Sequence, residues 1–218
     1  MRLYVFYNRL NMSYNLSDIN DIHTHHDYDD NTVYVKNIQL KELLADAYIS
    51  ELDDASARTN KLLSIGVHPW EIKDYSEETI FSSIDRLFPT LLLHPKVFAI
   101  GECGLDKSIS TDLDLQKSIF NRQIELSEQY QKPMILHVVR AYNEIIEFRK
   151  KHKPEQPWII HGFNSNEIIA KKLIETGCFL SININKLLTE KLQHTIQHIP
   201  TEFILNETDT IEYAKHTL

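Results

Sequence analysis

The 218-residue chain is 42% hydrophobic and 25% charged, and its formal net charge is −8. This length fits one α/β barrel, and the acidic balance argues against a surface that grips nucleic acid non-specifically, so bound cations would have to attract a phosphate substrate. No apolar stretch approaches the ~20 residues of a membrane span, and the segment that starts at Met1 is too short and interrupted for a signal peptide. We therefore expect a cytoplasmic protein with no membrane partner and no obligatory protein partner.

The chain is predicted to contain an N-terminal extension, residues 1–17, which a β-ribbon would suit, and a single barrel domain, residues 18–218. Eight short apolar runs are predicted to be strands, most of them buried on both faces. These runs are 19–23, 32–38, 62–67, 97–101, 134–138, 158–161, 178–182 and 203–206. Amphipathic helix patterns lie between most of them, at 77–88, 112–130, 141–151, 165–176 and 186–199. The fourth of these helices is expected to begin at a capping-box-like Ser165.

This alternation predicts a parallel sheet, and eight strands predict closure into a (β/α)8 TIM-like barrel. We expect a short variant of this barrel, because two of its helices should be reduced or missing. Only a short loop, 26–31, separates the first two strands, so the first crossover helix should be reduced or missing. The last helix should be reduced or missing too, because few residues, 210–218, follow the eighth strand. We expect the barrel to be irregular or partly open there.

Possible metal ligands follow the strands at the barrel end where active sites are built. His23 and His25 lie on one face of an extended first strand, although a polar loop with several histidines is the alternative for this pair alone. Four later strands each contribute one more candidate: Glu102, His137, His161 and Asp209. A single histidine in an apolar strand is more often a hydrogen-bonded core residue. Six such groups on one rim instead indicate a metal site.

Six segments in this order resemble motifs of the TatD family of metal-dependent hydrolases. They are Asp-Ile-His-Thr-His (21–25), Gly-Val-His-Pro-Trp (66–70), Ala-Ile-Gly-Glu-Cys-Gly-Leu-Asp (99–106), Lys-Pro-Met-Ile-Leu-His (132–137), Ile-Ile-His-Gly-Phe (159–163) and Asn-Glu-Thr-Asp (206–209). The resemblance covers about residues 18–210. It implies a (β/α)8-type barrel of the amidohydrolase group. The better-known members are Mg²⁺- or Mn²⁺-dependent deoxyribonucleases, and some are linked to deacylation of D-aminoacyl-tRNA.

Two divalent cations are implied by the same resemblance. His23, His25 and Asp209 would bind the first, and Glu102 would bridge to the second. His137 and His161 would complete the second site. The mixed donor set suits Mn²⁺, Zn²⁺ or Fe²⁺, and Mg²⁺ prefers more oxygen, so the sequence does not choose the metal.

Other roles are assigned to single residues. Asp209 is the candidate general base, with a purely metal-binding role as the alternative. His68 is expected to contact the substrate, or else to be held in the turn before Pro69. Glu207 is expected to orient a ligand, and Asp106 to bond the glycine-rich loop or a neighbouring strand end. Trp70 is expected to stack on a base or to cover the barrel rim.

Three departures from the family pattern affect the substrate prediction. Val139 replaces an arginine that family members often carry after strand five, and Arg140 follows at a position that should point elsewhere. The segment after strand eight is short, which would open one side of the cleft. Asn206 stands where an apolar residue would be usual, and would either bond a neighbouring strand end or cost stability.

The sequence therefore predicts a divalent-metal-dependent hydrolase of ester bonds that uses a metal-activated water. The first candidate is a TatD-type deoxyribonuclease that acts on DNA, with catalytic roles for Asp209 and Glu102. An aminoacyl-tRNA deacylase or small-molecule ester hydrolase with the same two-metal site is the alternative. A metal-stabilised binding module without activity is the third hypothesis.

Overall fold

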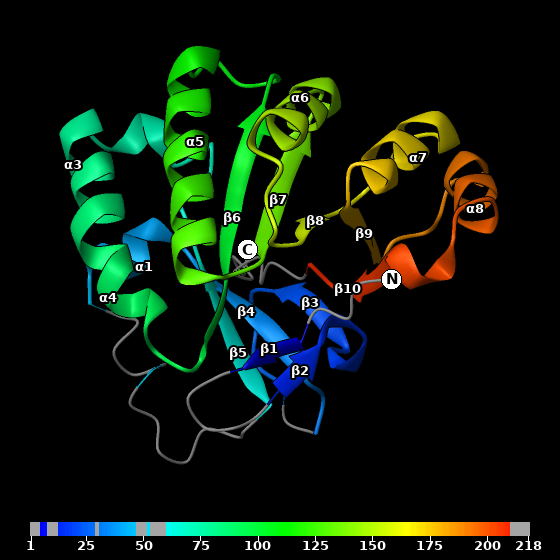
Figure 1. Ribbon diagram of the computed structural model, residues 1–218, viewed down its shortest axis with the longest axis horizontal. Helices are drawn as coiled ribbons and strands as arrows, with labels where there is room; N and C mark the ends of the chain where they lie inside the picture. The colour runs from blue at the N-terminus through cyan, green and yellow to red at the C-terminus, as the bar shows by residue number, and fades with distance from the viewer. Residues whose placement is uncertain (1–4, 8–12, 29–30, 47–51, 53–59, 210–218) are drawn as a thin grey trace, which may run out of the picture.

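The computed structural model of the chain describes residues 5–7, 13–28, 31–46, 52 and 60–209. Its centre is an eight-stranded parallel sheet with the order β10-β9-β8-β7-β6-β5-β4-β3, which curls into a nearly closed barrel (Figure 1). The strands are β3 Asp21–Thr24, β4 Tyr34–Ile38, β5 Lys61–Ile65, β6 Val97–Asp106, β7 Met134–Val139, β8 Trp158–Ile160, β9 Cys178–Asn183 and β10 Ile204–Glu207. The predicted barrel, with all eight strands near the expected positions, is confirmed.

An antiparallel ribbon precedes the barrel. It pairs β1, Val5–Tyr7, with β2, Ser13–Asn15, and thus provides a β-ribbon in the segment interpreted as an extension. A 3-10 turn, η1 Leu16–Asp18, then leads into β3. The buried side chain of Leu16 belongs to the same apolar cluster as Ile22 of β3, so this turn is packed against the barrel.

Helices cover the outside of the sheet (Figure 1). They are α1 Leu40–Leu44, α3 Glu77–Ser82, α4 Phe88–Leu92, α5 Leu113–Tyr130, α6 Tyr142–His152, α7 Glu167–Glu175 and α8 Glu190–Gln197. Short 3-10 turns are found at η2, Ile72–Asp74, and η4, Thr201–Phe203. The described part of the loop between β3 and β4 contains no helix, as expected. Among the described residues no helix is long and apolar enough to cross a membrane. Segment 210–218, where the last helix was expected to be reduced, lies outside the described residues.

Three local predictions need correction, and one helix was missed. The helix expected over 77–88 is divided into α3, a π-helical turn, η3 Ser83–Leu87, and α4, and the last of these begins next to Pro89, which has no backbone N–H. α1 was not predicted, because its burial of Leu40 and Leu43 depends on the tertiary fold. The cap of α7 is Asn166 rather than Ser165, since its side chain accepts a hydrogen bond from the Ile169 amide. β6 extends to Asp106, five residues beyond the predicted end.

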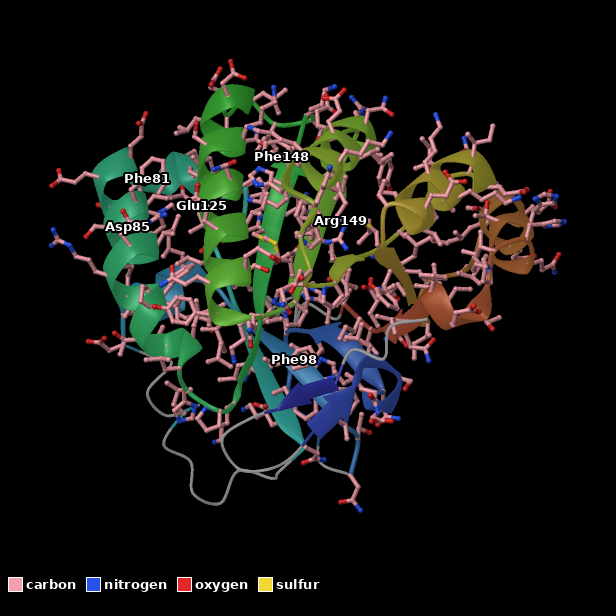
Figure 2. The ribbon with its side chains drawn as sticks, in the orientation of Figure 1. Phe81, Asp85, Phe98, Glu125, Phe148 and Arg149 are labelled. Atoms are coloured by element: carbon pink, nitrogen blue, oxygen red, sulfur yellow. The ribbon has the colours of Figure 1, made fainter. Side chains whose placement is uncertain are left out.

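The apolar core has two parts. The larger part lies between the sheet and its helices and includes Phe120, Trp158 and, at its edge, Phe148. The smaller part draws residues from β3 to β8 and from β10, so it fills the inside of the barrel. Phe98 of this inner cluster is labelled in Figure 2, well away from the outer Phe148. The polar site occupies the remaining end of the barrel interior.

The barrel closes between β3 and β10 through side-chain hydrogen bonds and one backbone hydrogen bond instead of a ladder. These strands lie at the two edges of the sheet order, with no backbone ladder between them in the described structure. Asp21 accepts hydrogen bonds from the Thr208 amide at 3.1 Å and the Thr208 hydroxyl at 2.6 Å. The Asp209 amide also donates to the His23 carbonyl at 3.1 Å. The expected irregularity is therefore present at this seam, and it lies beside the site.

Candidate metal centre

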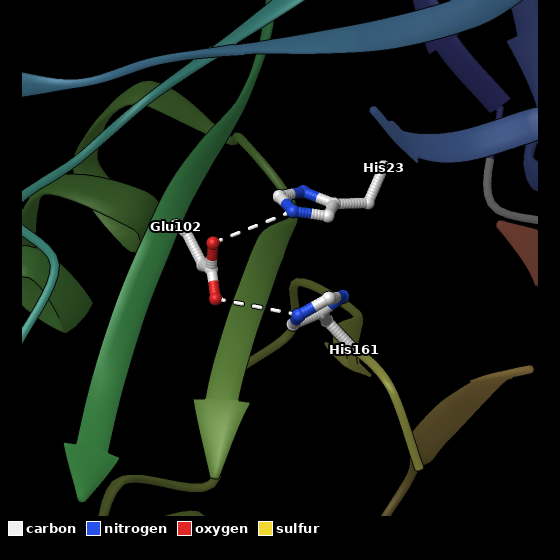
Figure 3. A group of neighbouring side chains, drawn as sticks. All are labelled: His23, Glu102 and His161. Carbon is white, nitrogen blue, oxygen red and sulfur yellow. Dashed lines mark ion pairs between the residues drawn. The ribbon is translucent and has the colours of Figure 1, made fainter. Parts of the chain in front are cut away.

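The carboxylate of Glu102 stands at the middle of the site, surrounded by histidines from four strands or strand ends. Its Oε2 lies 3.3 Å from His23 Nε2. Its Oε1 lies 3.0 Å from His137 Nδ1, 3.3 Å from His68 Nε2 and 3.4 Å from His161 Nε2. Figure 3 shows one oxygen of this carboxylate facing the imidazole of His23 and the other facing that of His161. Glu102 thus contacts candidate ligands on both sides with different oxygens.

Glu102 is held in place from β4. The Glu102 amide donates a 2.7 Å hydrogen bond to Asn37 Oδ1, which also accepts from the Ser64 hydroxyl. Burial by itself would raise the pKa of Glu102, but the nearby His161, His23 and His68 lower it well below its usual value. The carboxylate is therefore ionised and carries negative charge into a buried site.

The surroundings of His23 show whether a cation fits this site. The side chain is fully buried, and neither ring nitrogen has a hydrogen-bond partner. Its Nε2 faces Glu102 Oε2 and, at 3.9 Å, Asp209 Oδ1. A buried imidazole nitrogen without a partner between two carboxylates is poorly satisfied by protein groups alone. A divalent cation would satisfy it, so these residues fit a metal.

His25 and Asp209 complete a group of ligand atoms with His23, all within 4.8 Å of one another. Burial, followed by the neighbouring His23, lowers the pKa of His25 to about 4, so its imidazole is neutral and able to ligate. This group contains the residues predicted to bind the first cation.

His161 is oriented by a buried carboxylate, as predicted for Glu207. Glu207 Oε2 lies 3.0 Å from His161 Nδ1 and also accepts from the Gly162 amide and the Ser181 hydroxyl. Nε2 of His161 is thereby left to face Glu102. Burial opposes protonation, but Glu102 and Glu207 raise the pKa of His161 to about 10, so a cation bound at Nε2 would displace a proton there. This carboxylate–histidine arrangement is typical of metal ligands.

His137 is oriented in the same way by Asp106. Asp106 Oδ2 lies 3.0 Å from His137 Nε2 and accepts a 2.7 Å hydrogen bond from the Trp70 indole, which leaves Nδ1 of His137 facing Glu102. Asp106 Oδ1 accepts from the Ser108 amide and hydroxyl. Asp106 therefore bonds both its own loop and a neighbouring strand end.

His68 is held in the turn, which is one of its two predicted alternatives, and its ring also faces the site. Its Nδ1 accepts a 3.0 Å hydrogen bond from the Trp70 amide, which holds the turn around Pro69. Its Nε2 faces Glu102, and one ligand atom each of His68, Glu102 and His137 lie within 4.8 Å of one another. The ring is therefore fixed by the turn and still faces the site.

A cavity of about 380 Å³ opens onto the site and is lined by His25, His68, Glu102, His137, His161 and Asp209. The upper wall comes from the segment after β4 and from the loop after β5, and includes Lys41, Trp70, Lys73 and Tyr75. Trp70 is 52% exposed, so it forms a lip of the cavity while its indole nitrogen holds Asp106. The cavity joins a buried charged base to an edge that carries aromatic rings and both basic and acidic side chains, the latter from Glu71 and Asp74.

The family follows from this arrangement together with a sequence comparison. The family model described as TatD related DNase matches residues 21–214, which include every proposed ligand. The chain belongs to the TatD family.

Two relatives of this TatD-family chain carry informative names. A Mycoplasma pneumoniae protein named an uncharacterized metal-dependent hydrolase is 32% identical over 155 residues, which cover 67% of this chain and 58% of that protein. The Schizosaccharomyces pombe protein named deoxyribonuclease Tat-D is 29% identical over 155 residues, which cover 67% of this chain and 50% of that protein. The matched segment therefore spans only half to three fifths of these two relatives.

The fold agrees with the family. The crystal structure of YJJV, a TatD homolog from Escherichia coli, superposes with a TM-score of 0.72 at 20% sequence identity. The match covers 89% of this chain and 80% of that chain. At this identity the likeness supports the TatD barrel fold and adds nothing about substrate.

Three residues that sequence analysis did not assign also shape the site. Asp21 accepts hydrogen bonds from the His23 and Thr208 amides, and Asn37 fixes the Glu102 amide. Lys186, in the loop after β9, lies 3.1 Å from Asp209 Oδ2. The signal for Asn37 was a polar residue inside an apolar strand, and the signal for Asp21 was its two-residue spacing from His23. Nothing in the local sequence indicates Lys186.

The departures from the family pattern now have a structural setting. Arg140 is exposed and does not line the cavity, as expected from its position after Val139. Asn206 is exposed on β10, so the expected cost of burying its amide does not arise. The cleft lacks a guanidinium from this strand end.

Proposed function

We propose that this TatD-family chain is a two-metal phosphodiesterase that hydrolyses DNA. The observation that carries the proposal is the position of Glu102, whose two oxygens face different histidines. His23, His25 and Asp209 would hold one cation on the Oε2 side, and His137 and His161 would hold the second on the Oε1 side. When bound, such a pair polarises the phosphoryl group and lowers the pKa of a water molecule.

Asp209 is proposed as the general base. Its Oδ1 faces His23 Nε2, and its Oδ2 accepts from Lys186, whose side chain is 68% exposed. A carboxylate at the edge of the cavity can accept a proton from an attacking water, while its amide remains anchored to the His23 carbonyl. Glu207 and Asp106 would each hold a proton on the outer nitrogen of a ligating histidine, so that the inner nitrogen is free for the metal.

The edge of the cavity supports a nucleic-acid substrate. Trp70 offers an exposed aromatic face there, and Lys41 and Lys73 line the same edge together with the acidic Glu71 and Asp74. Bases stack on such rings without sequence preference, and lysines attract the phosphate backbone. The deoxyribonuclease name of the fission yeast relative supports the same substrate class.

The decisive experiment uses metal-stripped protein, Mg²⁺ or Mn²⁺, and an end-labelled single-stranded DNA oligonucleotide resolved on denaturing gels. We expect metal-dependent shortening of the strand. Glu102→Gln and Asp209→Asn should each lower the rate about a thousandfold or more, equivalent to ~4 kcal/mol of transition-state stabilisation. Lys107→Ala, which removes a half-exposed ion pair with Glu144 outside the cavity lining, is the matched control and should retain activity.

A carboxylic ester, in place of a phosphodiester, is the second candidate substrate, and two observations favour it. The strand-five arginine is replaced by Val139, and a cavity of about 380 Å³ is suited to a small ligand. Release of the amino acid from aminoacyl-tRNA, or hydrolysis of a chromogenic small ester, without cleavage of DNA would move the assignment to this class. Folded, metal-loaded protein inactive on all three substrates would instead support the non-enzymatic binding module.

A further inference from the structure

A second group of possible metal ligands lies on the outside of the barrel, where α7 and α8 pack together (Figure 1). Glu167 is the first residue of α7, and His194 and His198 are at the C-terminal end of α8. None of the three lines the catalytic cavity or touches the residues of the candidate metal centre. One ligand atom from each lies within 4.8 Å of the others.

The two histidines are arranged as chelating ligands. They are four residues apart, so they share one face of α8. Their rings are stacked, with centroids 4.1 Å apart and planes 18° apart. His198 Nδ1 lies 2.7 Å from the His194 carbonyl, to which it donates its proton. This bond selects the tautomer whose Nε2 has a free lone pair, as in many metal-ligating histidines.

Glu167 supplies an oxygen from the neighbouring helix. Its Oε2 lies 3.9 Å from His194 Nδ1. Its Oε1 forms an ion pair with Lys171, one turn further along α7. Lys171, together with the more distant His198 and His194, holds the pKa of the Glu167 carboxyl below its usual value. The carboxylate is therefore ionised, and Lys171 is the local positive charge that an incoming cation would have to displace.

We propose that Glu167, His194 and His198 form a peripheral binding site for a borderline divalent metal ion such as Zn²⁺, which links α7 to α8. Two imidazoles and one carboxylate are the donor set of three-ligand zinc sites, in which water completes the tetrahedron. The nitrogen donors disfavour Mg²⁺ and Ca²⁺, which prefer oxygen. The side chain of His194 is 62% exposed, so an ion can reach the site from solvent.

Such an ion would stabilise the last part of the barrel. α8 leads through η4 to β10, which carries Glu207 and is followed by Asp209. A ligand that binds only the folded state stabilises that state. The gain in unfolding free energy grows with the logarithm of the ratio of ligand concentration to dissociation constant. Fixing α8 on α7 would therefore protect the segment that delivers these two carboxylates, without any part in the chemistry itself. This inference does not depend on the proposed nuclease activity.

The test is retention of the untagged full chain on immobilised Zn²⁺–iminodiacetate. Matrix-bound metal can reach exposed His194 but cannot reach His23, which is fully buried. We expect the wild-type chain to be retained and His194→Ala or His198→Ala to elute early, because losing one arm of a chelate weakens binding about a hundredfold. Gln197→Ala, an exposed change on the same helix, should elute with wild type.

Two further variants sharpen the result. Glu167→Gln should weaken retention, and Lys171→Ala should strengthen it, because it frees Glu167 from its competing cation. Wild-type retention that survives the double change of His194 and His198 to alanine would overturn the proposal, as would no retention of the wild-type chain. Metal analysis of the full chain in solution provides a second measure, because the double variant should bind one Zn²⁺ fewer than wild type.

Discussion

The wall formed by β6 and β7 and the seam between β3 and β10 both carry proposed metal ligands, but they position them by different means. In the wall, a parallel backbone ladder pairs Cys103 with Leu136 and Gly104 with His137. At the seam the described residues form no ladder, and Asp21 joins the strands through its carboxylate. The wall is specified by backbone geometry, whereas the seam depends mainly on one buried side chain and its donors, with a single backbone hydrogen bond from the Asp209 amide to the His23 carbonyl.

This difference predicts where the site is fragile. A backbone ladder tolerates side-chain substitution but is sensitive to any atom that enters the space between strands. A side-chain junction tolerates backbone adjustment but fails when its acceptor is removed, since the buried donors then have no partner.

The largest effect is expected in the wall, for Gly104→Ala. Gly104 has a φ of 138°, and a Cβ there would lie 2.2 Å from the His137 carbonyl oxygen. Because the obstacle is backbone, we expect a loss of more than ~4 kcal/mol in the free energy of unfolding, measured by urea denaturation. Gly162→Ala is the control. Its φ is 57°, but the nearest atom is 3.6 Å away, so it should cost only ~1–2 kcal/mol. Equal losses for both variants would contradict the steric argument.

At the seam, Asp21→Ala should cost ~3 kcal/mol of unfolding free energy. It leaves the buried amides of His23 and Thr208 without their acceptor and removes one acceptor of the Thr208 hydroxyl. Hydrogen exchange should show faster exchange at Thr208 and Asp209, with little change in β6 and β7. Asp27→Ala, which removes a half-exposed carboxylate paired with Lys36 and Lys61, should cost ~1 kcal/mol or less. Uniform acceleration across the barrel would show that the seam is no weaker than the wall.

Asp106→Asn tests whether the wall orients its metal ligands. The amide can no longer accept from both the Trp70 indole and His137 Nε2 as the carboxylate does, so the His137 ring should be less well oriented. We expect metal affinity, measured by calorimetric titration, to fall about 10- to 100-fold while the fold is retained. Ser108→Ala, which removes a donor to the other oxygen of the same carboxylate, should change metal affinity much less. Equal effects of the two variants would mean that His137 is not oriented through Asp106.

The smallest effect is expected for Tyr28→Phe at the seam. The Tyr28 hydroxyl donates a 2.7 Å hydrogen bond to Asp21 Oδ2, which also accepts from Thr208. Because that acceptor keeps a second donor, the loss in unfolding free energy should be ~1 kcal/mol. A loss as large as that of Asp21→Ala would show that the tyrosine, rather than the carboxylate, closes the seam.

Much of the architecture was determined by the sequence alone. Short apolar runs such as 134–138 and 158–161 are long enough for buried strands and too short for helices, and their alternation with amphipathic segments predicts a parallel barrel. Because the C-terminal ends of parallel strands meet on one face, the positions of His23, Glu102 and His161 in the chain were sufficient to predict that they converge. The net negative charge and the residues at the strand ends could be interpreted without knowledge of any tertiary contact.

Only the tertiary structure decided how these side chains are held. Asp21 closes the barrel because Thr208 lies beside it, although 187 positions separate them in the chain. Glu102 is central because Asn37, on another strand, binds its amide. Which nitrogen of His137 faces inward depends on Asp106, and His194 and His198 become candidate ligands because α7 places Glu167 next to them. Local propensity specifies elements and their order, whereas hydrogen bonds between distant residues form only once the chain has brought them together.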